Sequence, residues 1–178
     1  MVSYLSISIV SEVSLSASVF VVGCLTGSLV GGYQCDFLGR KWSMVVDCFS
    51  MALGLLTISL APSTAFLLLG RFLTGHCSGS NLVSTPIFVS EISHPDLRGT
   101  TSVLTMACYT TGFFVSMLSG AIMPWRIATG VFMITPLLSA VLLLFVQESP
   151  TWLLRKGRKE QASDALYFYR GDRDTVKY

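Results

Sequence analysis

The stretch Asp36-Phe-Leu-Gly39-Arg40-Lys41 lies between two long apolar runs and decides how the chain folds. With Gly32 it completes the pattern G-x3-D-x2-G-R-K. Two cations at a hydrophobic boundary indicate which side of a membrane the boundary faces, because cytoplasmic loops carry an excess of Lys and Arg. Gly39 permits a tight turn, and Asp36 can accept hydrogen bonds from Arg40. We therefore interpret the stretch as a folded hairpin between two membrane helices.

The composition indicates an integral membrane protein. The chain is 52% hydrophobic and 12% charged, whereas about 25% of the residues in a soluble domain are charged. Five segments are long and apolar enough to cross a bilayer, which takes about 20 residues. Such spans must be helical, because the bilayer core offers no water to backbone amides, so we predict an all-α fold. The predicted spans are Leu15–Tyr33, Trp42–Leu60, Phe66–Ser90, Thr100–Met123 and Ile127–Val146.

The distribution of Lys and Arg predicts the orientation. The loops after the first, third and fifth spans contain Arg40, Lys41, Arg98, Arg155, Lys156, Arg158 and Lys159, whereas the opposite short loops contain only Arg126. The positive loops are therefore expected to be cytoplasmic. We expect an extracellular loop at 1–14, a transmembrane bundle at 15–146 and a cytoplasmic helical linker at 147–178. The net charge of +2 follows from this asymmetry and gives no reason to propose nucleic acid.

The number of spans suggests an incomplete bundle. Transporter halves are often built from three-plus-three repeats, and five spans break that count. We expect one helix to be missing before residue 1 and a C-terminal half to be missing after residue 178. These missing parts and the lipid bilayer are the expected partners of the chain.

A glycine face occurs on the predicted third span. Arg71, Gly75 and Gly79 recur every four residues on one side of a helix. Glycines at this spacing let another membrane helix approach closely. An unpaired cation is costly inside a membrane, so we expect Arg71 to be buried on this face against a group on the missing first helix.

Charged residues at the other predicted cytoplasmic turns complete a candidate gate network. Glu91 and Arg98 flank the turn at His94-Pro95, and they can pair with each other or with the first hairpin. Glu148 follows the last span, where Ser149 is a plausible N-cap of a new helix. A network formed only when the cytoplasmic side is closed would bias a conformational equilibrium. The predicted gate network is Asp36, Gly39, Arg40, Lys41, Glu91, Arg98 and Glu148.

Four motifs together resemble the sugar porter branch of the major facilitator superfamily, whose members include facilitated glucose and trehalose transporters. The resemblance runs from about Glu12 to Arg170. It implies part of an N-terminal six-helix bundle, from a carrier that binds a sugar between two halves and works by alternating access. The motifs are Gly32-x3-Asp36-x2-Gly39-Arg40-Lys41, Gly75-x3-Gly79-x8-Phe88-x2-Glu91-x6-Arg98-Gly99, Trp125-Arg126-x3-Gly130 and Glu148-Ser149-Pro150-x-Trp152-Leu153.

The departures from the family pattern bear on the substrate. Met106 stands where hexose carriers have a substrate-binding Gln, and trehalose-facilitator-like members also depart from Gln there. The change therefore counts against glucose more than against sugars in general. His76 replaces an aliphatic residue, and Gln147 and Thr151 replace Pro and Arg.

The predicted substrate-binding residues are Thr101, Thr105, Met106 and Tyr109 on the fourth span. Hydroxyl groups at helical spacing suit the hydroxyls of a sugar, and Met106 could cover the apolar face of a sugar ring. The alternative is that the threonines bond to their own helix or to a neighbour.

Other functions remain as alternatives at this stage. The parent could be another carrier of the superfamily, such as an organic-ion transporter, or the chain could be a non-transporting truncated product or regulatory partner. Asp47 could join the cytoplasmic network or act in a proton relay. No phosphate loop, metal cluster or nucleophile with a base occurs, so we predict neither an enzyme nor a cofactor nor a metal. The plasma membrane is the family's usual location.

Overall fold

The computed structural model describes residues 2–170, with side chains described for residues 12–94 and 96–169. Within residues 2–170 every regular element is a helix, as the sequence predicts. The elements are α1 (Val2–Leu38), α2 (Arg40–Ser59), α3 (Thr64–Ile92), the 3-10 turn η1 (Pro95–Leu97), α4 (Arg98–Ile122), α5 (Trp125–Phe132), α6 (Ile134–Phe145), α7 (Pro150–Arg155) and α8 (Lys159–Arg170).

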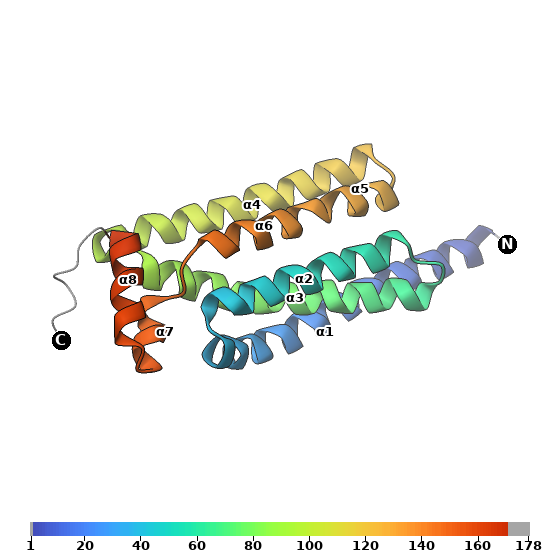
Figure 1. Cartoon of the computed structure of the whole chain (residues 1–178). Coiled ribbons are helices and arrows are strands. Elements are labelled where there is room, and N and C mark those ends of the chain that lie inside the picture. The colour runs from blue at the N-terminus through green and yellow to red at the C-terminus, as the bar shows by residue number, and fades with distance from the viewer. Residues whose placement is uncertain (1, 171–178) are drawn as a thin grey trace.

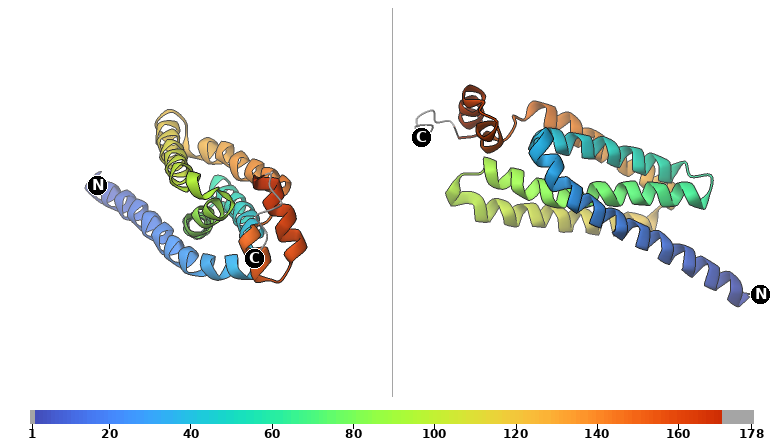
Figure 2. Two further views of the ribbon diagram at one scale, coloured as in Figure 1. Left: turned by 90° about the vertical axis from the view of Figure 1, so that its left-hand side faces the viewer. Right: turned by 90° about the horizontal axis from the view of Figure 1, so that it is seen from below.

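The helices form an elongated bundle with a small cap at one end. Helices α1 to α6 run lengthwise, and α3 packs on both α1 and α2 (Figure 1). Helices α7 and α8 lie across the end of the bundle at which α1 ends and α2 begins (Figures 1 and 2). We call this the α7 end.

Four helices in the described part are long and apolar enough to cross a membrane. They cover Glu12–Leu38, Arg40–Ser59, Arg98–Ile122 and Trp125–Phe145. The predicted count of five spans is not confirmed, because α3 is not among them although it is 29 residues long. The reason lies in its composition: the buried side of α3 consists mainly of glycine, serine and threonine.

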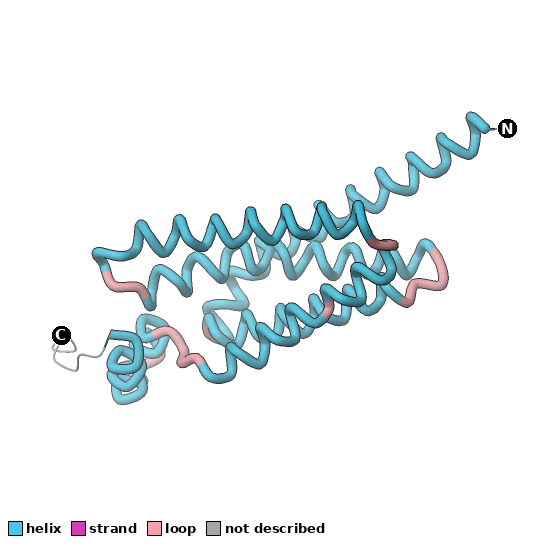
Figure 3. The backbone as a smooth tube through the Cα atoms, turned by 90° about the horizontal axis from the view of Figure 1, so that it is seen from above, coloured by secondary structure: helices cyan, strands magenta, loops and turns pink. Residues whose placement is uncertain are grey.

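Two predicted boundaries differ from the structure. Residues 1–14 were expected to form a loop, but α1 already begins at Val2. The last predicted span is a continuous run in sequence, yet it is divided into α5 and α6 at Met133 (Figure 3). Pro136 explains the division, because a proline lacks an N–H and its ring clashes with the carbonyl four residues earlier, here that of Phe132.

Helices α1 and α3 pack with their backbones in close contact. A Cβ atom at Gly75 would collide with the carbonyl oxygen of Phe20, and one at Gly79 with that of Cys24. Both glycines are buried, on the face predicted for them. Close approach through small residues is how membrane helices gain packing energy without a hydrophobic effect between them.

Candidate functional site at the α7 end

The turn between α1 and α2 can accept only glycine. Gly39 has φ of 101°, a conformation that side chains with a Cβ rarely adopt. A Cβ at this position would also collide with the carboxylate of Glu148. The first and last motifs of the chain therefore meet in space at Gly39.

Arg40, the first residue of α2, is the centre of the site. Its side chain is 4% exposed and forms a two-pronged pair with Glu91 of α3. Nε lies 3.1 Å from Oε2 and Nη2 lies 3.2 Å from Oε1. Nη1 donates to Asp36 Oδ1 and to the Cys35 carbonyl, both at 3.2 Å. This geometry uses the planar fork of a guanidinium, which an ammonium group cannot reproduce.

The two ion pairs of Arg40 contribute differently to stability. The Glu91 side chain is 13% exposed, whereas that of Asp36 is 71% exposed. An exposed pair contributes little because water and salt screen it. Breaking a buried pair is strongly destabilising, since it leaves an uncompensated charge. The bond to Glu91 therefore dominates the energetics of the cluster.

Ser149 brings the end of the last span into the same cluster. It occupies the N-cap position of α7 but makes no side-chain capping bond there, contrary to the sequence interpretation. Its hydroxyl instead donates to Glu91 Oε2 in a very short contact. Asp36, Arg40, Glu91 and Ser149 form what we call the Arg40 cluster, and it joins α1, α2, α3 and the entry to α7.

Glu148 serves a neighbouring role at the start of α2. Its Oε1 accepts hydrogen bonds from the backbone N–H of Lys41 at 3.0 Å and of Ser149 at 2.9 Å. A carboxylate at this place accepts a bond from an N–H that has no partner within the helix. The positive end of the helix dipole also stabilises its negative charge. Its Oε2 is buried and has no hydrogen-bond partner among the described residues.

Two further contacts hold the end of the bundle together. Lys41 Nζ donates to the Leu144 carbonyl at 3.0 Å. Trp152 is 8% exposed and its Nε1 donates to the Asp36 carbonyl at 3.1 Å. This bond was not predicted, because the sequence shows Trp152 only as part of the motif that begins at Glu148 and gives no sign of its partner.

Arg98 lies outside the Arg40 cluster. Its Nε donates to the Ser90 carbonyl at 3.1 Å, and the residue is exposed. Of the two partners that the sequence left open for Glu91, the structure shows the first hairpin and not Arg98. The structure thus brings together all the predicted gate network except Arg98.

The predicted substrate residues share α4 but do not enclose a site among the described residues. The Thr105 hydroxyl bonds to the Thr101 carbonyl at 2.8 Å, and the Thr101 hydroxyl bonds to the Leu97 carbonyl at 3.0 Å. Met106 is 57% exposed and Tyr109 is 38% exposed. The threonine bonds match the alternative in which these hydroxyls serve their own helix.

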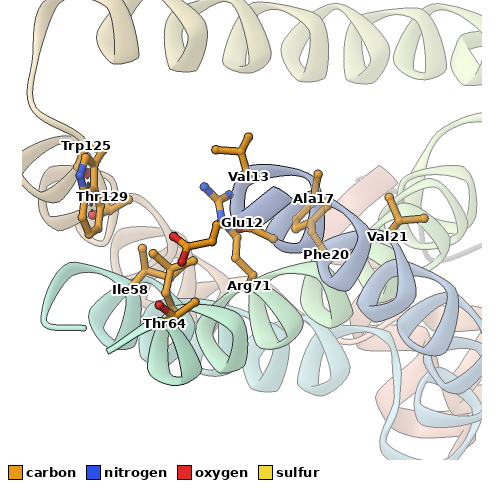
Figure 4. Close-up of a pocket in the computed structure, with 12 residues that line it drawn as sticks. Glu12, Val13, Ala17, Phe20, Val21, Ile58, Thr64, Arg71, Trp125 and Thr129 are labelled. Carbon is orange, nitrogen blue, oxygen red and sulfur yellow. Dashed lines mark hydrogen bonds between the residues drawn. The ribbon is translucent and has the colours of Figure 1, made fainter. Parts of the chain in front are cut away.

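A cavity of about 540 Å³ lies at the opposite end, between α1, α3 and α5 (Figure 4). Arg71 of α3 and Glu12 of α1 both line it, with Trp125. Arg71 is exposed in this structure, which does not contain the first helix against which its burial is predicted, so that burial stays a prediction. Its long side chain extends into the open cavity, whereas Gly75 and Gly79 contact α1 directly.

Asp47 has a separate buried network within the bundle. It is 2% exposed. Its Oδ2 accepts a bond from Ser80 Oγ at 2.6 Å and its Oδ1 accepts one from Gln34 Nε2 at 3.2 Å. Asp47 therefore links α1, α2 and α3 without joining the Arg40 cluster. Its position two turns after Arg40, on the same side of α2, could be read from helical spacing, but its partners could not.

The site contains a buried ion pair that joins separate helices. No group of three or more His, Cys, Asp or Glu residues able to hold a metal occurs in the part of the chain that the structure describes.

Comparison with solved structures defines the class of fold. The chain matches the major facilitator superfamily proton:xylose symporter XylE bound to 6-bromo-6-deoxy-D-glucose, with a TM-score of 0.85. The match covers 96% of this chain and 42% of that chain, at 19% identity. The fold is therefore that of one part of a major facilitator.

The chain belongs to the sugar (and other) transporter family, whose model matches residues 6–178. It is 32% identical over 164 residues to "Sugar transporter ERD6-like 6" of Arabidopsis thaliana, covering 91% of this chain and 33% of that protein. It is 31% identical over 171 residues to "Facilitated trehalose transporter Tret1-2 homolog" of Drosophila sechellia, covering 93% of this chain and 35% of that protein. The chain thus spans about a third of the length of these relatives.

The family and the apolar helices together identify an integral, multi-pass membrane protein. The resemblance noted from the motifs is confirmed. The relatives are named as transporters and not as enzymes, in agreement with the absence of enzyme motifs.

Proposed function

We propose that the chain is part of a carrier that moves a sugar across a membrane by alternating access, with the Arg40 cluster as its conformational latch. The observation that carries this proposal is the buried two-pronged pair between Arg40 and Glu91, with Ser149 bound to the same carboxylate. Membership of the sugar transporter family supports a sugar as the substrate of this carrier. The proposed substrate class is a hexose or a trehalose-like disaccharide.

The latch works through the cost of separating its charges. In the closed arrangement Arg40 and Glu91 satisfy each other inside the protein. Opening this end of the bundle must hydrate both groups or move them to new partners. Because a buried charge without a partner is costly, the cluster favours the closed arrangement until substrate binding elsewhere shifts the equilibrium.

The proposed membrane orientation places the latch on the cytoplasmic side. Arg40, Lys41 and the cations of the α7–α8 hairpin gather at this end, as expected for the inner face. We assign the carrier to the plasma membrane, the usual location in the family. We also keep Thr101, Thr105, Met106 and Tyr109 of α4 as the proposed sugar-contacting residues, with the missing first helix and C-terminal half completing the binding site.

Uptake into vesicles tests the proposal. Vesicles containing the whole carrier should take up labelled trehalose or a hexose in competition with unlabelled sugar. Uptake of an organic cation without uptake of sugar would reject the sugar assignment. The 178-residue chain alone should give no uptake, because one bundle cannot present a site to alternate sides. Measurable flux from it would show that no second half is needed.

The latch is tested separately from the substrate. Glu91→Gln keeps the size of the side chain but removes the charge that faces Arg40, so it should slow transport while sparing sugar binding from outside. Arg98→Gln is the matched control, since Arg98 lies outside the cluster. Equal transport rates for Glu91→Gln and the unmodified carrier would contradict the latch.

A further inference from the structure

The turn between α7 and α8 concentrates positive charge at the α7 end. Four cations occur within five residues and all are exposed: Arg155, Lys156, Arg158 and Lys159. The ion pairs of the described residues use Arg40 and His94 instead. This charge is therefore not neutralised by an ion pair within the described part of the protein.

The turn forms a shallow hollow that is lined by two of these four cations, Arg158 and Lys159. Gly157 has φ of 76°, which reverses the chain between the two helices. An open hollow of about 430 Å³ lies beside it, lined by Gly157, Arg158, Lys159, Glu160 and Gln161. Its cationic side chains come from the start of α8, where the helix dipole also favours an anion.

The hairpin that presents the turn is fixed to the bundle. Trp152 and Leu153 of α7 pack with Ala162 and Ala165 of α8 as one buried cluster. At the far end of α8, Tyr169 donates to the Gln147 carbonyl at 2.6 Å. Together with the bond from Trp152 to α1, these contacts hold α8 across the end of the bundle (Figure 1).

Exposed apolar side chains lie on the same hairpin as the cations. Leu154 is 45% exposed, Tyr167 is 50% exposed and Phe168 is 56% exposed. A short helix that combines Lys and Arg with exposed apolar side chains has the character of a segment lying in a membrane interface.

We propose that the turn between α7 and α8 binds the anionic phospholipid headgroups of the bilayer that the bundle crosses. The argument is charge complementarity: four exposed cations that form no ion pair with the described residues, beside an open hollow, face a phosphate-bearing surface that carries negative charge. The exposed apolar side chains of the hairpin favour a lipid over a soluble anion, because a lipid also supplies acyl chains for them to contact. The inference rests on the proposed membrane placement of the bundle, which puts the hairpin at headgroup level.

The binding of lipid can be measured without transport. The full chain is purified in nanodiscs of phosphatidylcholine, short-chain phosphatidylserine is titrated in, and the bound lipid is counted by native mass spectrometry. Each cation near an anionic surface contributes about a fivefold change in affinity. Replacing two of them in R158Q/K159Q should weaken phosphatidylserine binding on the order of tenfold or more.

The matched control neutralises two acids of the same helix. E160Q/D164N should bind phosphatidylserine as tightly as the unmodified chain or more tightly. Circular dichroism checks that both variants keep their helices. If R158Q/K159Q does not fold, the salt dependence of phosphatidylserine binding to the unmodified chain serves as the test. Raising the salt from about 0.1 M to about 0.5 M should weaken this binding, since salt screens exposed charges.

Three results would overturn the proposal. The first is equal phosphatidylserine affinity in R158Q/K159Q and in the unmodified chain. The second is binding that does not respond to salt. The third is competition by inorganic phosphate at the same concentration as the lipid, which would assign the hollow to a soluble anion. None of these depends on sugar uptake, so a failure here is distinct from a failure of the proposed transport function.

Discussion

Helices α1–α3 and helix α4 all run lengthwise in the bundle (Figure 1), yet they are held in the structure in different ways. Among α1, α2 and α3, glycines bring backbones into contact and buried polar side chains bond across the helices. Helix α4 contains no buried residue, and it meets α3 at its beginning, where Ser93 bonds to Thr101 at 3.1 Å. The difference shows that hydrophobicity places a helix in the membrane, whereas small and charged residues fix its neighbours.

The largest expected effect concerns the centre of the packed region. Arg40→Leu removes the cation and leaves the carboxylate of Glu91 buried without it. We expect a loss of about 3–5 kcal/mol in the free energy of unfolding, measured by denaturant titration in detergent micelles. Arg98→Leu on the exposed start of α4 should cost less than about 1 kcal/mol. Similar losses of unfolding free energy in Arg40→Leu and Arg98→Leu would contradict the proposed difference between helices α1–α3 and helix α4.

One substitution made in both regions compares their packing directly. At Gly79 of α3, alanine places a methyl group against the Cys24 carbonyl of α1, so the helices must separate. We expect Gly79→Ala to cost about 1–3 kcal/mol. At Gly112 of α4, nothing lies within 4 Å of an added Cβ, so Gly112→Ala should stabilise the helix by about 0.5–1 kcal/mol.

The measurement is again the free energy of unfolding, with helix content checked by circular dichroism. A stabilising Gly79→Ala would show that α1 and α3 are not in close contact, and a destabilising Gly112→Ala would reveal a tight neighbour of α4.

A further substitution isolates the contact between Gly39 and Glu148. Gly39→Ala should cost about 1–3 kcal/mol, because it combines a strained φ with a collision. Gly157→Ala is the control: its φ of 76° is also strained, but nothing lies within 4 Å of the added Cβ. The excess cost at Gly39 should disappear in a Glu148→Ala background. An excess that persists there would assign it to the backbone alone.

The smallest effect is a pH dependence at the α7–α8 hairpin. Burial raises the pKa of Tyr169 from 10.0 to about 12. Because the folded state holds this proton up to a higher pH than the unfolded state does, the contribution is complete below pH 10 and is lost as the pH rises to about 12. Tyr169→Phe should flatten the fall in unfolding free energy over this range. An unchanged pH profile would mean that the phenol is solvated.

The sequence predicted the helices and most members of the site because both depend on local pattern. The G-x3-D-x2-G-R-K hairpin and the positions of Glu91 and Glu148 pointed to one end of the bundle without any coordinates. Pro136 also carried a readable signal for the division of the last span, although the apolar run around it obscured that signal.

The missed features depend on how each helix is rotated about its axis. Ser149 has a good N-cap sequence, yet its hydroxyl bonds to Glu91 because α3 presents that carboxylate there. The partners of Asp47 come from α1 and α3, and no spacing within α2 indicates them.

The bond from Glu148 to the start of α2 has a consequence for synthesis. The carboxylate lies 107 residues after the Lys41 amide that it caps. A ribosome therefore completes α2, α3, α4, α5 and α6 before this capping group exists. Until then the Lys41 amide lacks this partner and is free to bond to water. The local contacts of Arg40 with Asp36 and Cys35 can form earlier, and the arrival of Glu148 adds the partner of the Lys41 amide.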